Sequence, residues 1–318
     1  MARYLRYPTG VAARLSEAAK HAHFIRACVG SVAVRTIALS SLALSIGAAA
    51  STGTPSRSSV RSATVSSSRE AVSTRHYYVA AGGAQSGPCS KSQPCRSLDH
   101  AVSLANHIPF AEQPVSISVG KGTFITHLNF PDQPYPEKSL AITGESPGTT
   151  KLSAAGSGMV LIALADAPPI DVQNLTITGG TGTNHVGGGA VHDGGNFMNF
   201  FHVTFANNVD TASPSSGGAI FDDAGTMTIT DSTISHNSAG STSSPGLGGG
   251  VSEVGGSLTI TASIISGNSV QTKGVGGGLY VNDGHLKVED STITGNSALA
   301  TATGTANMVM NRIATPAT

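Results

Sequence analysis

The stretch MTITDSTISHN (227–237) decides the fold, because the chain contains five versions of its first eight residues. Aligned without gaps, the five segments are IDVQNLTI (170–177), MNFFHVTF (198–205), MTITDSTI (227–234), LTITASII (258–265) and LKVEDSTI (286–293). The first, third and eighth positions of every segment are apolar, and the eighth recurs every 28 to 31 residues. Such a period indicates stacked repeats rather than a single folded core.

The spacing within each segment predicts two short strands joined by a bend. The first and third positions lie two residues apart, which is the period of a β-strand with one buried face. The eighth position lies five residues further on, so an unbroken strand would turn it to the opposite face. A bend at the fifth position of each segment returns the eighth to the interior. These bend residues are Asn174, His202, Asp231, Ala262 and Asp290.

Glycine clusters between the segments predict a third strand in each repeat. GGAV (188–191), GGAI (217–220), GGGV (248–251) and GGGL (276–279) each end in an apolar residue. Three strands and three bends in about 29 residues describe one coil of a parallel β-helix, in which neighbouring coils lie about 4.8 Å apart. One coil cannot bury its apolar face alone, so the repeats stabilise one another.

An asparagine follows each of the last four repeats at the same distance, and we expect these residues to stack. Asparagine tolerates the left-handed backbone conformation of a bend, and stacked amides can form a hydrogen-bonded ladder. The expected ladder consists of Asn208, Asn237, Asn268 and Asn296.

The composition excludes several classes of protein. The 318 residues include 39 glycines, only 11% are charged, 5% are aromatic, and the formal net charge is zero. A disordered polyelectrolyte carries more charge, and a nucleic-acid-binding protein carries a basic excess. The glycines do not follow the three-residue period of collagen.

The N-terminal 76 residues have the composition of targeting and linker segments. Residues 1–50 combine scattered arginines, the apolar run IALSSLALSI (37–46) and three alanines, which is typical of an export signal. The apolar run is too short to span a bilayer, so we expect no membrane span after signal cleavage. Residues 51–76 are rich in serine and threonine and predict a disordered linker. In an exported chain Cys89 and Cys95 predict one small disulfide loop.

The chain resembles pectin-lyase-like β-helix proteins that bacteria secrete. The resemblance rests on YYVAAGG followed by GPCSKSQPCRSLDHAVSLA (77–105) and VSISVGKGTF (115–124). GGAI (217–220) and FANN (205–208) also resemble repeats of polymorphic outer membrane proteins. The resemblance implies an all-β, single-stranded, right-handed parallel β-helix over 77–310, followed by a tail (311–318). Residues 97–105 predict a short helix that caps the first coil, because Leu98, Val102 and Ala105 share one helical face.

Four acidic residues are the candidates for a chemical site. Asp193, Asp222 and Glu253 each follow a glycine-led strand at the same position, and Asp223 adjoins Asp222. On adjacent coils the three carboxylates would stack, which suits Ca²⁺ or a pair of catalytic acids in glycoside hydrolysis. The third interpretation, which the sequence favours, is ordinary Asx-type bends.

These observations favour a secreted or cell-surface protein that acts as a non-catalytic structural, adhesive or carbohydrate-binding module. The expected partner is a polysaccharide or another cell-surface ligand, and no nucleic acid is expected. The alternative is a polysaccharide lyase or glycoside hydrolase that uses the four acids. The family's usual arginine base has no counterpart, since no arginine occurs between Arg96 and Arg312. Phe221 and Tyr280, which alternate with inward positions, are candidates for a small sugar-stacking platform.

Overall fold

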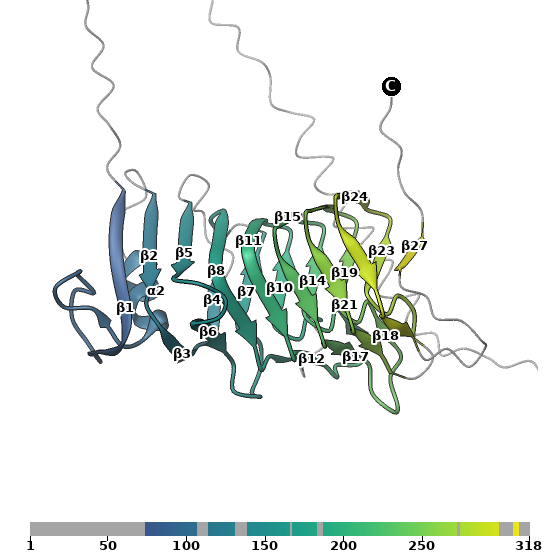
Figure 1. Ribbon diagram of the computed structural model, residues 1–318, viewed down its shortest axis with the longest axis horizontal. Coiled ribbons are helices and arrows are strands. Elements are labelled where there is room, and N and C mark those ends of the chain that lie inside the picture. The colour runs from purple at the N-terminus through teal and green to yellow at the C-terminus, as the bar shows by residue number, and fades with distance from the viewer. Residues whose placement is uncertain are drawn as a thin grey trace, which may run out of the picture. The chain divides into compact units, whose positions relative to one another are not determined.

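The computed structural model describes residues 74–106, 114–130, 139–165, 167–182, 187–271, 274–298 and 308–311. These residues form a right-handed parallel β-helix, in which successive coils lie side by side along one axis (Figure 1). The predicted all-β solenoid is therefore confirmed. The signal predicted over 1–50, most of the linker predicted over 51–76 and residues 312–318 of the tail lie outside the described residues.

The described strands form four parallel sheets. The path of the first sheet is β1 (Arg75–Ala84), β2 (Val115–Val119), β5 (Leu140–Gly144), β8 (Ile170–Thr178), β11 (Phe197–Ala206), β15 (Thr226–Thr230), β20 (Ser257–Thr261) and β24 (His285–Glu289). The same sheet also contains β3 (Gly122–Ile125), β6 (Thr150–Ser153), β16 (Thr233–Ser235), β21 (Ile264–Ser266) and β25 (Thr292–Thr294).

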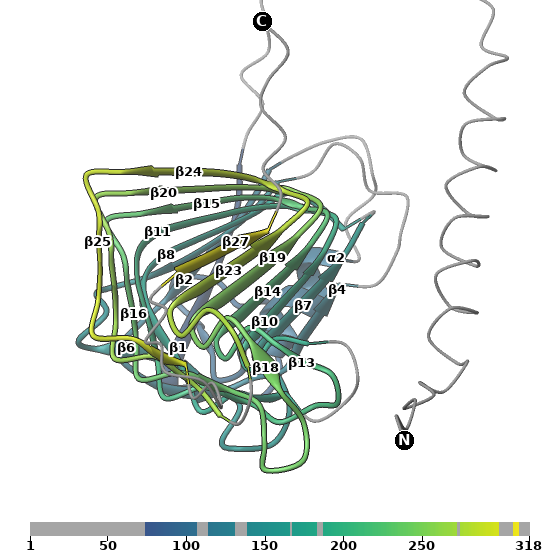
Figure 2. The same ribbon diagram turned by 90° about the vertical axis from the view of Figure 1, so that its right-hand side faces the viewer.

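The second sheet contains the four glycine-led strands that the repeats predicted, which begin at Val191, Ile220, Val251 and Leu279, together with three strands that follow no glycine cluster. It consists of β4 (Leu128–Phe130), β7 (Leu161–Leu164), β10 (Val191–Gly194), β14 (Ile220–Asp223), β19 (Val251–Val254), β23 (Leu279–Asn282) and β27 (Met308–Asn311). The third sheet consists of β9 (Thr181–Gly182), β12 (Val209–Asp210), β17 (Ser238–Ala239), β22 (Ser269–Val270) and β26 (Ser297–Ala298). A fourth pairs β13 (Ser215–Ser216) with β18 (Gly246–Leu247). The end-on view shows the strands from β8 to β24 of the first sheet and the strands from β4 to β27 of the second sheet on different sides of the coil (Figure 2).

The strand register places the three predicted apolar positions in three columns, which are buried except in the last repeat, where Val288 is 37% exposed and Leu286 and Ile293 are partly buried. Ile229 pairs with Phe200 on one side and with Ile260 on the other, and Ile234 pairs with Phe205 and Ile265 in the same way. All six side chains are buried. Each fully buried aliphatic side chain in these columns stabilises the folded state by roughly 1.5–3 kcal/mol.

The five predicted bend residues all adopt a left-handed backbone conformation. Their φ angles lie between 48° and 54°, at Asn174, His202, Asp231, Ala262 and Asp290. Asparagine and aspartate adopt this conformation more readily than alanine or histidine. The bend explains how two apolar positions separated by an odd number of residues both point inward.

The N-terminal part is less regular than the repeats. The predicted helix is α2 (Leu98–Asn106), which buries Leu98, Val102 and Ala105 in the main core. Strand β1 lies outside the repeats and was not predicted, and it pairs in parallel with β2. β1 begins at Arg75, two residues before the predicted start of the β-helix at 77. No helix within the described ranges is both long and apolar enough to cross a membrane.

Candidate functional site

Three acidic residues form a column inside the solenoid, which we call the carboxyl column. Asp222 on β14 pairs directly with Asp193 on β10 and with Glu253 on β19. The neighbouring coils continue the same column with Ala163 and Val281. Each acid lies two residues after an inward apolar residue, so strand alternation turns it inward as well. The predicted stacking of these acids is present, whereas the adjacent Asp223 is exposed.

All three side chains of the carboxyl column are fully buried, with 0% of their surface exposed. Gly225 leaves the room that two of them need, because a β-carbon there would collide with the carboxylates of Asp193 and Asp222. Gly284 has the same role beside Glu253. The carboxyl groups therefore fill the space between coils and do not border an external groove.

One oxygen of each carboxyl group closes the bend that follows its strand. The backbone N–H of Asn196 donates to Asp193 Oδ1 over 2.7 Å, and that of Gly225 donates to Asp222 Oδ1 over 2.9 Å. The N–H of Gly256 donates to Glu253 Oε1. This is the local side-chain-to-backbone bonding that the bend interpretation predicts.

The second oxygen of each group is buried without a hydrogen-bond partner. These atoms are Asp193 Oδ2, Asp222 Oδ2 and Glu253 Oε2. An ionised carboxylate only accepts hydrogen bonds, whereas a protonated carboxyl group also has a hydrogen to donate. The surroundings of the carboxyl column therefore favour the protonated, neutral forms.

The pKa values have the direction that this geometry requires. Burial raises the pKa of Asp193 to about 7 and that of Glu253 to about 7, against bonds from the following backbone N–H groups that lower them. Burial and the adjacent charge of Asp193 raise the pKa of Asp222 to about 8. Burial also lowers the pKa of His192, next to Asp193 on β10, and the charge of Asp223 partly offsets that effect.

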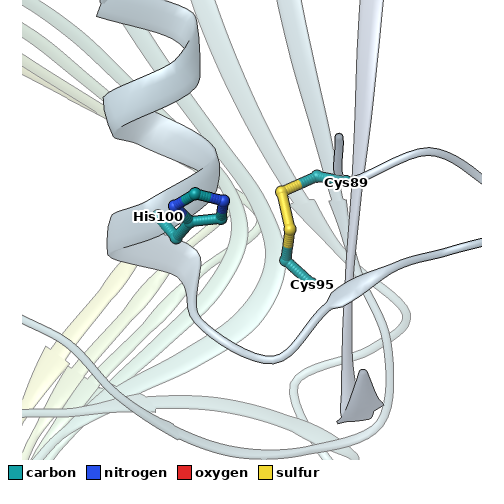
Figure 3. A group of neighbouring side chains, drawn as sticks. All are labelled: Cys89, Cys95 and His100. Atoms are coloured by element: carbon teal, nitrogen blue, oxygen red, sulfur yellow. A yellow bond between two sulfur atoms is a disulfide. The ribbon is translucent and has the colours of Figure 1, made fainter. Parts of the chain in front are cut away.

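The carboxyl column is not a compact metal site. Among the described residues, one group of three His, Cys or carboxylate ligand atoms lies within 4.8 Å of one another, and it is Cys89, Cys95 and His100. Figure 3 shows that the two sulfur atoms of this group are joined in a disulfide. His100 Nε2 also lies 3.0 Å from the carbonyl oxygen of Gly87. Neither arrangement offers the six to eight oxygen ligands that Ca²⁺ takes.

The four asparagines form the predicted ladder. Asn208 Nδ2 donates to Asn237 Oδ1 over 3.0 Å, and Asn237 and Asn268 repeat this bond to the next coil over 2.9 Å. A second ladder, which was not predicted, consists of Ser232, Ser263 and Ser291, each of which follows a bend residue. The Oγ of each serine accepts a backbone N–H from the previous coil. Its signal was the serine after the bend in three successive repeats.

Two exposed aromatic residues were also missed. Phe197 and Phe201 on β11 point outward, with 59% and 47% of their surface exposed. The aromatic pair considered from sequence, Phe221 and Tyr280, is only partly exposed, and Phe221 packs against the ring of His192. The signal for Phe197 and Phe201 was their alternation with buried Met198 and Phe200.

The comparisons with known proteins add no closer assignment. The chain matches no protein-family model, no curated protein and no solved structure. The structure supports a parallel β-helix fold, but no comparison supports an assignment to the pectin-lyase-like or the polymorphic outer membrane proteins. The fold and its interior define the chain as a parallel β-solenoid repeat protein.

Proposed function

We propose that this chain is an exported, non-catalytic β-helix that presents a regular surface to a polysaccharide or another cell-surface ligand. The observation that carries the proposal is the burial of the carboxyl column. The acids with raised pKa values face the sealed interior, so a polymer on the outside does not reach them. The outer face of β11 and β15 instead carries hydroxyl, amide and aromatic side chains such as Thr226, Asn199 and Phe197, which are exposed and suited to contact a polymer without reacting with it.

Binding and cleavage assays on one panel of polysaccharides test this proposal. The purified protein is incubated with neutral and anionic polymers, and reducing ends and unsaturated uronate absorbance are followed over hours. We expect retention by at least one polymer and no new chain ends. Cleavage above the level of a heat-treated control would overturn the proposal, and so would the absence of binding to any polymer in the panel.

One observation favours an enzyme as the second candidate. A carboxyl group with a pKa near 7 is suited to general acid catalysis. Asp193 and Glu253, with pKa values of about 7, meet that condition, and the pKa of Asp222 between them is about 8. Their complete burial weighs against this role, since a general acid must lie within hydrogen-bond reach of the substrate. If the panel reveals cleavage, Asp222→Asn and Asp223→Asn decide whether these acids perform it.

Export is the part of the proposal that rests on the sequence alone. Residues 1–50 fused to a reporter that is active only outside the cytoplasm test it directly. We expect reporter activity, and an otherwise identical fusion with Leu42 and Leu44 changed to Arg controls for the apolar run. Equal activity from both fusions would overturn the assignment of an export signal.

A further inference from the structure

The outer face of β11 differs from the other outer faces of the repeats, because it carries two exposed phenyl rings. In the same positions on β15 the next coil has Thr226 and Thr230. Met198 and Phe200, which alternate with the exposed residues along β11, are buried. The exposed rings therefore do not result from a shift of strand register, and they are not stabilised by burial in the core.

Polar side chains lie between and beside the two rings. Asn199 projects from the same face midway between them, and its Nδ2 donates to Asp171 Oδ1 on β8 over 2.8 Å. Gln173 pairs with Phe201 on that side, and Thr228 pairs with Asn199 on the other. Amide, carboxylate and hydroxyl groups thus lie within reach of any ligand that covers the rings.

We call this surface the β11 platform. It consists of Asp171, Gln173, Phe197, Asn199, Phe201, Thr226, Thr228 and Thr230. Asp171 is its one charged side chain, and that carboxylate already accepts a hydrogen bond from Asn199. The platform contains no lysine or arginine, so it lacks the cations that nucleic acids and polyuronates require.

The spacing of the rings sets the size of the ligand. Phe201 lies four residues after Phe197 along the strand, and a rise of about 3.3 Å per residue places their α-carbons about 13 Å apart. A single monosaccharide does not cover both rings, whereas a chain of several sugar units does. The C–H face of a pyranose packs on the negative face of a phenyl ring, and its hydroxyl groups find partners in Asn199 and the neighbouring threonines.

The geometry points to the β11 platform as the binding site for a neutral polysaccharide chain, with Phe197 and Phe201 stacking on separate sugar units. This inference rests on the proposed binding function and specifies its surface and its ligand class. Neutrality of the ligand follows from the charge of the platform, and its polymeric nature follows from the distance between the rings.

Affinity electrophoresis of the full chain tests this inference, with hydroxyethylcellulose, xyloglucan and galactomannan as neutral probes and polygalacturonate as the anionic probe. We expect at least one neutral probe to retard the protein. The double variant Phe197→Ala/Phe201→Ala is expected to weaken that binding at least tenfold, and each single variant less. Ile264→Ala is the matched control, because Ile264 is also 47% exposed but lies on β21, outside the platform. Its affinity is expected to stay within twofold, and equal melting temperatures establish that all variants are folded.

The outcomes separate this inference from the proposed function. Undiminished binding of a neutral probe by the double variant would overturn the platform and leave the binding function intact. Retardation by polygalacturonate alone would overturn the neutral ligand class. A wild-type protein that is dimeric by light scattering, with a monomeric double variant, would assign the rings to a second copy of the chain. Cleavage of a probe, or no binding to any probe, would overturn the proposed function itself.

Discussion

The asparagine ladder and the carboxyl column are both polar stacks in the interior of one solenoid, but only the ladder satisfies its own atoms. Asn237 Nδ2 donates to Asn268 Oδ1 and to the carbonyl oxygen of Phe205, while its Oδ1 accepts from Asn208. In the carboxyl column each group has one bonded oxygen and one buried oxygen without a partner. An amide both donates and accepts, so a stack of amides is complete, whereas a stack of carboxylates requires protons.

The largest effect is expected when an acid is placed in an interior position that offers it no bend. Ile234→Asp introduces a carboxylate into a column of Phe205 and Ile265, where the strand N–H groups are already paired. We expect the free energy of unfolding to fall by more than about 4 kcal/mol, because the charge is buried and unpaired. Urea titration measures this loss. A loss below about 1 kcal/mol would show that Ile234 is not enclosed.

Removal of one amide from the complete stack is expected to have the next largest effect. Asn237→Ala leaves the carbonyl of Phe205 and the amide of Asn208 without their partners, so a loss of about 2–4 kcal/mol is expected. Ser235→Ala, two residues earlier on the outer face of β16, is the control and is expected to change stability little. Equal urea midpoints for the two variants would contradict the structural role of the ladder.

The carboxyl column is expected to make the protein less stable as pH rises. The folded-state pKa values of about 7, 8 and 7 lie above the ordinary values of 3.8, 3.8 and 4.5. Between about pH 4 and 8 the folded state therefore holds more protons than the unfolded chain, and the free energy of unfolding falls with pH. His192 opposes this trend below pH 6.5, because its pKa is lowered. The three acids together are expected to change the free energy of unfolding more than the one histidine does, so the melting temperature is expected to be lower at pH 8 than at pH 5.

Asp222→Asn isolates the contribution of the column to this pH dependence. The asparagine keeps an oxygen that can accept the N–H of Gly225 and adds a donor for a neighbouring carboxylate. We expect a higher melting temperature than wild type at pH 8 and a smaller decrease between pH 5 and 8. Asp223→Asn, at the exposed neighbouring position, is the control. A variant with the wild-type pH profile would show that Asp222 is already ionised in the folded protein.

The repeat made most of the fold predictable from sequence. The three apolar columns, the bend residues such as Ala262 and the stacking of Asn208 with Asn237 all follow from side-chain period and spacing. Strand β1 was missed because it lies outside the repeats and has no counterpart to align with. Its burial depends on pairing with β2, which is a tertiary effect that no local pattern encodes.

The candidate site was only partly predictable for a different reason. Strand alternation and the repeat period place Asp193, Asp222 and Glu253 together, so their stacking was predictable. Strand alternation alone does not show whether the three carboxyl groups line an external groove or lie inside closed coils. That depends on how neighbouring residues such as Gly225 and Gly284 pack against them. The exposed rings of Phe197 and Phe201 follow from the same alternation, but only the finished surface shows that nothing covers them.

The smallest effect is expected when aspartate is introduced at a position on the outer face of the sheet. Thr228→Asp matches Ile234→Asp in the residue introduced and in sheet, but Thr228 alternates with buried Met227 and Ile229 and faces solvent. Water solvates the new carboxylate there. The free energy of unfolding is therefore expected to fall by about 1 kcal/mol or less, because only a β-branched residue suited to a strand is lost. Urea titration of Ile234→Asp and Thr228→Asp gives the two decreases in the free energy of unfolding, and their ratio measures how differently the inner and outer faces of the sheet tolerate a charge. Similar midpoints would mean that the alternation assigned to β15 is wrong, and the inward orientation of the neighbouring columns would then have to be revised with it.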